Sequence, residues 1–152
     1  MKTERERIDA FLGSASFAVA GVSRNKNKFG SVIFRELKAR GLKIYPLNPA
    51  MDEVEGEKCY PSARDLPEKV EGLISVVSPS AAAKVAKDAW EAGIEKIWFQ
   101  QGSQSDEALE FCREKGLTVV AKECIFMYYE PVTSFHRFHR GIAKLFGKYH
   151  KA

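Results

Sequence analysis

The stretch Phe17–Gly30, FAVAGVSRNKNKFG, begins with an apolar run that ends at Gly21 and continues into a polar, basic loop. Apolar residues with helical spacing follow over residues 32–37. A strand, a glycine turn and a helix in this order are typical of the first βα unit of a nucleotide-binding α/β domain. An ordinary surface turn, in which the glycines serve only the chain reversal, is the alternative at this point.

The composition of this loop favours a phosphate ligand. Gly21, Ser23 and Gly30 are small, so the backbone can approach a ligand closely. The first N–H groups of the following helix have no partner within that helix and carry partial positive charge, which suits an anion. Arg24 and Lys28 add full positive charges beside the helix start. We therefore expect a phosphate site here.

Apolar runs and helical patterns alternate along the rest of the chain. The runs begin near residues 17, 43, 73, 96 and 118, and further helices are expected over 4–13, 80–92, 105–115 and 133–148. Gly41, Gly93 and Gly116 each stand where a helix would end in a left-handed turn before the next run. Five runs separated by helices predict an α/β fold, a doubly wound, Rossmann-like domain with a five-stranded parallel sheet.

The expected domain occupies residues 1–130, and residues 131–152 are expected to form a basic amphipathic helix of the same domain. Between residues 50 and 71 the alternation lapses, which predicts a loop with one short helix over 62–66. The last 22 residues carry five bases and no acid, so the other 130 carry 19 bases and 20 acids. Because the body is nearly neutral, nucleic acid is not its expected partner.

Length and composition limit the class of protein. A chain of 152 residues with 45% hydrophobic residues can bury a core without disulfides or a structural metal. Its three cysteines are widely spaced, which predicts reduced thiols. No apolar run approaches the ~20 residues of a membrane span, and residues 1–7 are charged, unlike a secretory signal. We therefore expect a cytoplasmic protein with no membrane span.

In a doubly wound sheet, ligands bind at the carboxyl ends of the strands. The residues expected at this edge are Ser23–Gly30, Asn48–Met51, Ser78–Ser80, Gln100–Ser103 and Lys122–Cys124. They are small, amide and proline residues with few titratable groups, and no nucleophile–base pair or metal-ligand spacing is evident. This composition favours a binding crevice over a catalytic centre, so neither catalytic residues nor a metal site is expected.

The identity of the nucleotide depends on missing motifs. The first turn lacks the G-x-G-x-x-G pattern, and Asn48-Pro49 stand where a dinucleotide domain places an acid for the ribose hydroxyls. The phosphate loop G-x-x-x-x-G-K-[ST] is also missing. NAD and ATP are both disfavoured. An NAD(P)-binding oxidoreductase or redox sensor, and an interaction protein acting through its basic tail, stay open as alternatives.

Several short motifs together carry a family resemblance. They are Ala20-Gly21-Val22-Ser23, Tyr45-Pro46-Leu47-Asn48-Pro49, Glu55-Gly56-Glu57-Lys58-Cys59-Tyr60-Pro61-Ser62, Val77-Ser78-Pro79, Trp98-Phe99-Gln100-Gln101-Gly102 and the late Cys124. In this order, through about residues 10–128, the chain resembles the small CoA-binding domain proteins. It is similar to the amino-terminal domain of the succinyl-CoA synthetase α-subunit. The resemblance implies a protein that binds CoA or acyl-CoA without catalysis, or in a regulatory role.

The resemblance also implies positions for the parts of CoA. The pyrophosphate would lie at Gly21, Ser23, Arg24, Phe29 and Gly30; the adenosine ribose against Asn48 and Pro49; the adenine or ribose beside Ser78 and Pro79; and the pantetheine arm along Gln100–Gly102 and Cys124. A base for the 3′-phosphate is missing after the second strand, so Arg24, Lys26 or Lys28 would have to supply it.

Three further expectations can be tested. A bulky residue at Gly30 should crowd the phosphate and leave the fold largely intact. Cys124 is either a thiol that reacts with CoA or a small buried apolar residue. The apolar stripe of the tail helix packs on its own sheet, forms a homodimer, or contacts a membrane or nucleic acid.

Overall fold

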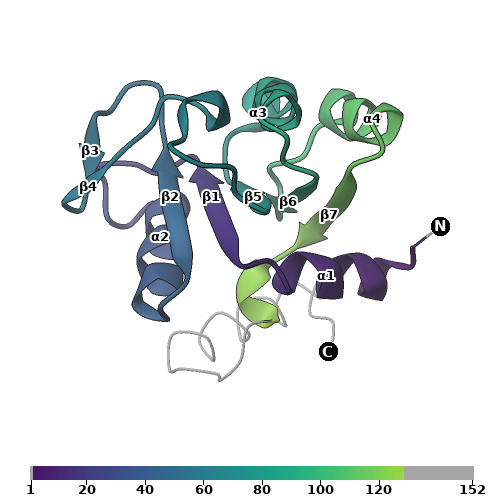
Figure 1. Cartoon of the computed structure of the whole chain (residues 1–152), viewed down its shortest axis with the longest axis horizontal. Coiled ribbons are helices and arrows are strands. Elements are labelled where there is room, and N and C mark those ends of the chain that lie inside the picture. The colour runs from purple at the N-terminus through teal and green to yellow at the C-terminus, as the bar shows by residue number, and fades with distance from the viewer. Residues whose placement is uncertain (1, 129–152) are drawn as a thin grey trace.

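A computed structural model describes residues 2–128 (Figure 1). The predicted tail helix lies outside these described residues. Five parallel strands form one sheet with the order β2-β1-β5-β6-β7. The strands are β1 Ser16–Ala20, β2 Lys43–Leu47, β5 Gly72–Ser75, β6 Lys96–Gln100 and β7 Thr118–Glu123. The predicted five-stranded parallel sheet is confirmed.

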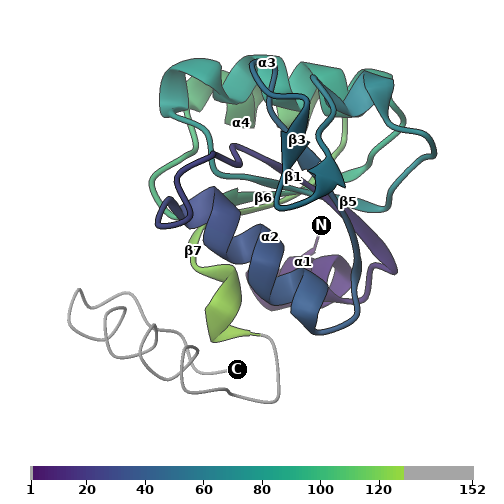
Figure 2. The same ribbon diagram turned by 90° about the vertical axis from the view of Figure 1, so that its left-hand side faces the viewer.

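Four helices cover the two faces of this sheet. They are α1 Glu4–Leu12, α2 Phe29–Ala39, α3 Pro79–Glu91 and α4 Asp106–Glu114. α1 and α2 pack on one face, and α3 and α4 pack on the other, so the molecule has three layers (Figures 1 and 2). This arrangement confirms the predicted doubly wound α/β fold. None of the described helices has the length and apolar character to cross a membrane.

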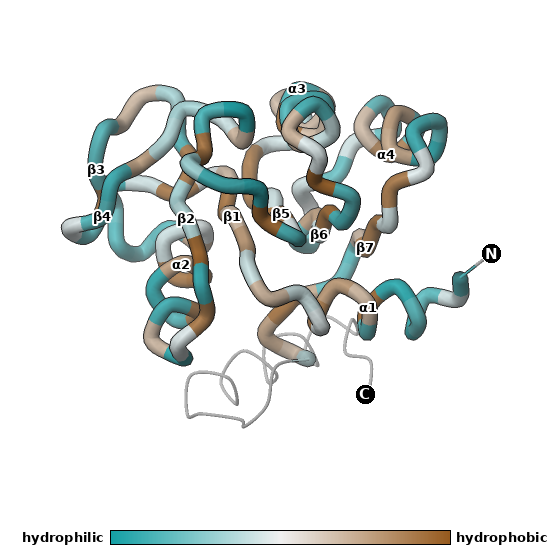
Figure 3. The backbone as a smooth tube through the Cα atoms, in the orientation of Figure 1, coloured by the Kyte–Doolittle hydropathy of each residue, from teal (hydrophilic) through white to brown (hydrophobic). Residues whose placement is uncertain are grey.

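The two faces bury side chains of different size. Towards α1 and α2 the core holds large rings, among them Phe11, Phe17 and Trp98, all fully buried. Towards α3 and α4 it contains many alanines, including Ala82 and Ala86 of α3. Small residues allow α3 to lie close to the sheet. Apolar residues follow the strands, while polar residues lie on the outer helix surfaces (Figure 3).

The predicted turn signals are found where they were expected. Gly41, Gly93 and Gly116 have φ of +84°, +84° and +70°, the left-handed conformation that ends a helix with little strain. Ser105 is the N-cap of α4, and its hydroxyl accepts a hydrogen bond from the Ala108 N–H at 3.1 Å. These local signals explain why the sequence predicts the element boundaries well.

The segment predicted as a loop contains more order than expected. A small hairpin pairs β3 (Glu53–Val54) with β4 (Glu57–Lys58), and the turn between them has positive φ at Glu55 and Gly56. The predicted short helix is the 3₁₀ turn Ala63–Asp65. Between these elements, Tyr60 runs along the outer edge of β2, exchanging backbone hydrogen bonds of 3.0 and 2.9 Å with Pro46 and Asn48.

Candidate functional site

The strand order reverses between β1 and β5. From β1 the chain moves outward to β2, then crosses back to β5 and continues to β6 and β7. The loops that follow β1 and β5 therefore diverge at the carboxyl edge, which is where doubly wound sheets form their ligand crevice. The two strands stay paired up to Ala20 and Ser75, and the Val76 N–H donates to the Ala20 carbonyl at 2.8 Å.

Two glycines make this crevice possible. Gly21 has φ +107°, and a Cβ there would lie 2.9 Å from the carbonyl carbon of Val76. Gly30, at the start of α2, lies against the backbone of Gly21. A Cβ on Gly30 would lie 2.2 Å from the Gly21 carbonyl oxygen. Helix, strand and the loop after β5 therefore meet backbone to backbone at this point.

The close packing of Gly30 corrects one expectation. Gly30 is buried, and its missing side chain makes room for the Gly21 backbone. A bulky residue there would displace α2 from β1, so the prediction that the fold would tolerate it was wrong. No local pattern signals this contact, because it joins residues nine positions apart through backbone atoms.

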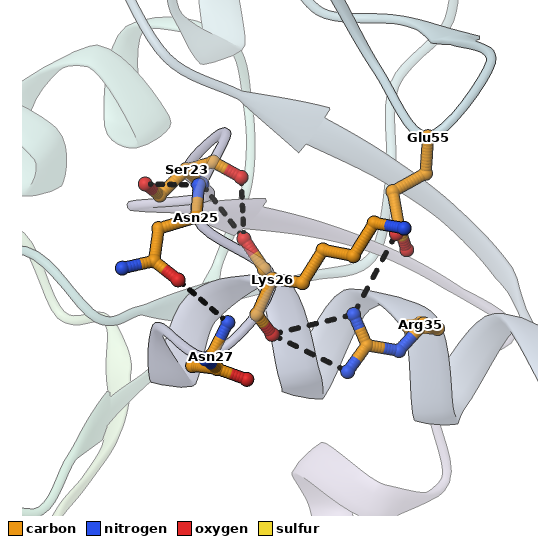
Figure 4. Close-up of polar contacts among 7 residues, drawn as sticks. Ser23, Asn25, Lys26, Asn27, Arg35 and Glu55 are labelled. Atoms are coloured by element: carbon orange, nitrogen blue, oxygen red, sulfur yellow. Dashed lines mark hydrogen bonds and ion pairs between the residues drawn. The ribbon is translucent and has the colours of Figure 1, made fainter.

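The loop between β1 and α2 is held by its own polar groups. The Ser31 hydroxyl donates to the Ser23 carbonyl at 2.7 Å and accepts from the Ser23 N–H at 2.9 Å. The Asn25 N–H donates to the Ser23 hydroxyl, and the Asn27 N–H donates to the Asn25 side chain (Figure 4). Such turns fix a loop without neighbouring strands, so the loop is shaped before any ligand binds.

A second helix residue supports the middle of the same loop. The Arg35 guanidinium donates to the Lys26 carbonyl at 3.3 and 3.4 Å, and it also lies 3.6 Å from the Glu55 carboxylate (Figure 4). This contact links the loop to α2 and to the hairpin turn. The sequence did not suggest a role for Arg35.

Asn48, predicted to contact a ribose, ties two loops together. Its side-chain N–H donates to the Val22 carbonyl at 2.7 Å, and its side-chain oxygen accepts from the Ala50 N–H at 2.8 Å. Both ends of the amide are thus used to join the turn after β1 to the turn after β2. Pro49 follows directly and lines the crevice.

Helix ends and cations make this edge attractive to anions. Neither Lys28 at the N-cap of α2 nor Ser78 at the N-cap of α3 makes a side-chain capping bond, whereas Thr3 and Ser105 cap α1 and α4. Arg24 is exposed, as is Lys28, and within residues 2–128 neither forms an ion pair. Partial and full positive charges therefore face solvent together here.

A small apolar hollow lies beside the switch point, between the sheet and α3. Its volume is about 60 Å³, and its walls include Gly21, Pro49, Ala63 and Val77. Typical ligand pockets begin near about 300 Å³, so only one part of a nucleotide would enter it. Asp88 closes one side, with its carboxylate 2.9 Å from the Lys84 ammonium.

The other predicted residues are spread along the same edge. Ser78 and Pro79 are exposed at the start of α3, and Gly102 is exposed in the turn after β6 with φ +85°. Gln100 is the last residue of β6 and Cys124 directly follows β7, but each side chain is only 3% exposed. The Gln100 side-chain oxygen accepts from the Ile125 N–H at 3.1 Å, so its amide faces the 3₁₀ turn Ile125–Met127.

Ser103 was expected at this edge, but the sequence did not suggest its structural role. Ser103 is buried, and its hydroxyl lies 2.8 Å from the Ser75 carbonyl and 2.6 Å from the Gln100 carbonyl. It therefore holds the ends of β5 and β6 together. Its position in a loop after a strand is the only signal the sequence offers.

The thiols are shielded from water. Burial raises the pKa of Cys124 to about 12 and that of Cys112 to about 12, and it also raises the pKa of Cys59. Because the thiolate is the reactive form, these groups are protonated and inert near neutral pH. Residues 2–128 contain no group of three or more histidine, cysteine or acidic side chains placed to hold a metal.

A doubly wound sheet with a glycine-lined crevice and two helix N-termini at its switch point defines a nucleotide-type binding domain. Comparison with known proteins gives the particular group: the chain belongs to the CoA binding domain family, which it matches over residues 15–130. This match confirms the resemblance seen in the sequence motifs and spans every strand of the sheet.

Three relatives illustrate the range of the family. The chain is 26% identical over 129 residues to the acetate–CoA ligase (ADP-forming) II subunit alpha of Pyrococcus furiosus, covering 78% of this chain and 28% of the ligase subunit. It is 29% identical over 116 residues to YneT of Bacillus subtilis, covering 74% and 83% of the two chains. A hypothetical protein from Pyrococcus horikoshii has a similar structure, with TM-score 0.75, 30% identity and coverage of 82% and 87%. This chain thus spans about a quarter of the ligase subunit.

Proposed function

We propose that this chain binds CoA or an acyl-CoA at the switch point, as a binding or regulatory module without turnover of its own. The observation that carries the proposal is the family match over residues 15–130, which includes both loops of the crevice. The start of α2 supports it, because no side chain caps this helix and the exposed Arg24 and Lys28 lie in the loop that leads into it.

The pyrophosphate is assigned to the turn between β1 and α2. Gly21, Ser23 and the α2 start at Phe29 and Gly30 lie here, and the helix N-terminus favours negative charge. A helix terminus alone contributes only ~0.3–1 kcal/mol near the surface. Full charges are therefore needed for a ligand with three phosphate groups, and Arg24 is placed to provide one.

The 3′-phosphate and adenosine are assigned to the neighbouring loops. Lys28 and Arg24 supply positive charge where the turn after β2 has none. Pro49 and Gly21 line the small hollow, and Ser78 and Pro79 lie at the start of α3. These residues form the proposed binding surface for the adenine or ribose. Asn48 stabilises this surface through its hydrogen bond to the Val22 carbonyl.

The pantetheine arm is assigned to the path past the end of β6. Gly102 is exposed there, and even a Cβ at this position would meet no atom within 4 Å, so an arm can pass over it. Gln100 and Cys124 are buried below this path and support its floor. A thiol–disulfide reaction between Cys124 and CoA is disfavoured because the pKa of Cys124 is raised to about 12.

Two features favour CoA over NAD. No acidic side chain follows β2 at the position that binds ribose hydroxyls in dinucleotide domains, and Asn48 there is engaged with Val22. The positively charged loop suits the extra 3′-phosphate of CoA. Small and amide residues along the crevice favour binding over catalysis.

A thermal shift series tests this proposal with CoA, acetyl-CoA, NAD and ATP. A ligand at 100 times its dissociation constant stabilises the folded state by ~2.7 kcal/mol. For a domain of this size that raises the melting temperature by about 5–10 °C. CoA and acetyl-CoA are expected to give this rise. Stabilisation by NAD alone would overturn the proposal in favour of a dinucleotide-binding protein.

A further inference from the structure

The sheet has two edges, and the described residues cover only one of them. The outer edge of β2 carries Pro46 and is paired with Tyr60. The other edge is β7, which lies last in the strand order, with α4 on one side and α1 on the other (Figure 1). No strand within the described residues pairs with its outer side. An open edge strand offers a ready template for another extended chain.

On this outer side, the backbone of β7 has groups without a partner among residues 2–128. The Thr118 N–H donates to the Glu95 carbonyl at 2.8 Å, so Thr118 faces β6. Successive residues of a regular strand direct their N–H and C=O groups to opposite sides, so those of Val119 face outward. Val119 is partly exposed, and the pairing with β6 shifts register after Val120. The edge ends at Lys122, whose φ of +68° breaks the strand geometry.

A groove follows this edge. It has a volume of about 850 Å³ and runs between the start of α1 and the end of α4, with β7 as its floor. Leu109, Leu117 and Val119 supply apolar surface. Its charged residues are mainly basic: Lys2, Arg7 and Arg113 against the single acid Glu4.

The cations of the groove are only partly neutralised. The Arg113 guanidinium is paired with Glu110. Arg7 donates to the Lys2 carbonyl at 2.7 Å, and neither Arg7 nor Lys2 has an acidic partner in residues 2–128. Exposed Lys122 adds a further positive charge at the end of the strand. An anionic occupant complements this charge.

We propose that the β7 edge binds an extended, acidic segment of a partner protein, which adds a strand to the sheet. Backbone hydrogen bonds to Val119 would set its register, and acidic side chains would meet Arg7 and Lys2. A second copy of this chain is a poorer occupant, because a symmetric contact would place basic groove against basic groove. The basic tail, with five bases in residues 131–152, is disfavoured for the same reason.

The test uses fluorescence anisotropy with the full chain and two labelled ten-residue peptides, one alternating Val and Glu and one alternating Val and Lys. We expect only the acidic peptide to bind. Arg7→Glu should weaken that binding by about tenfold, since it reverses a charge in the groove. Lys87→Glu is the matched control, because Lys87 is exposed on α3 and outside the groove, and it should leave the affinity unchanged.

A second variant tests the backbone. Val119→Pro removes an outward N–H and no ladder bond, and proline is tolerated at such edge positions. It should also weaken the acidic peptide about tenfold, while CoA binding at the switch point stays unchanged and separates this proposal from the proposed function. Equal affinity for both peptides, or no effect of Arg7→Glu, would overturn the proposal. Concentration-dependent dimerisation that Val119→Pro abolishes would instead assign the edge to a second copy.

Discussion

Replacing Gly30 by alanine tests the packing that shapes the crevice. The new Cβ would lie 2.2 Å from the Gly21 carbonyl oxygen and 2.7 Å from its carbonyl carbon. Both are backbone atoms, so no side chain can rotate away. Relief requires a movement of roughly 1 Å between the start of α2 and the end of β1.

The expected loss of stability follows from this geometry. Overpacking in a well-packed core costs about 1–3 kcal/mol, and this site belongs at the upper end because both partners are backbone. For a domain of this size, that corresponds to a fall of about 4–12 °C in melting temperature. CoA affinity should fall as well, since the first turn of α2 carries the proposed phosphate site.

Gly13→Ala is the matched control for this measurement. Gly13 has φ −77°, and a Cβ there would contact its nearest atoms at ordinary distances of 3.4 and 3.7 Å. Differential scanning calorimetry of both variants should show Gly13→Ala within about 2 °C of the parent protein. If Gly30→Ala melts as high as Gly13→Ala, the close contact between Gly30 and Gly21 is refuted.

Three other predictions concern charge, burial and capping. The double variant Arg24→Ala, Lys28→Ala should weaken CoA binding about tenfold and flatten its salt dependence in calorimetric titrations, whereas the control Lys87→Ala should change neither. Equal CoA affinities of the double variant and the control would place the phosphates elsewhere. Burial raises the pKa of Cys112 and Cys124 to about 12, above the ~8.5 of an unfolded thiol. Their contribution to the free energy of unfolding is therefore present below about pH 8.5 and is lost as pH rises towards 12. Cys112→Ala should make that decline shallower in denaturant titrations at several pH values, and an unchanged slope would show that the thiol is accessible. Ser105→Ala removes a capping bond and should lower the melting temperature by about 2–4 °C, while Ser78→Ala, with no capping bond to lose, should change it little; equal shifts would contradict the assigned caps.

Local patterns made the fold predictable from the sequence. Apolar runs mark all five strands, and Gly41, Gly93 and Gly116 mark the turns that precede three of them. These signals depend on residues that are close together in the chain, so they can be interpreted without knowledge of the tertiary structure. The hairpin Glu53–Lys58 was missed because its strands are only two residues long, too short for a period-2 pattern.

The candidate site was predictable only in outline. Strand ends placed Gly21, Pro49 and Ser78 at the carboxyl edge of the sheet, where doubly wound domains bind their ligands. The contacts between loops were not predictable, because they join residues far apart in sequence: Asn48 bonds Val22, and Ser103 bonds Ser75. Burial of Gln100 and Cys124 likewise depends on how the turn after β7 folds over β6.

Titration of ¹⁵N-labelled protein with CoA, followed by amide chemical shifts, tests most directly whether CoA binds at the switch point. The account predicts the largest shift changes at the two loops of the crevice, Gly21–Ser31 and Val77–Ala81, with little change at Gly13 or at Val119 on the β7 edge. No saturable change with CoA, or changes centred on the β7 edge, would contradict it.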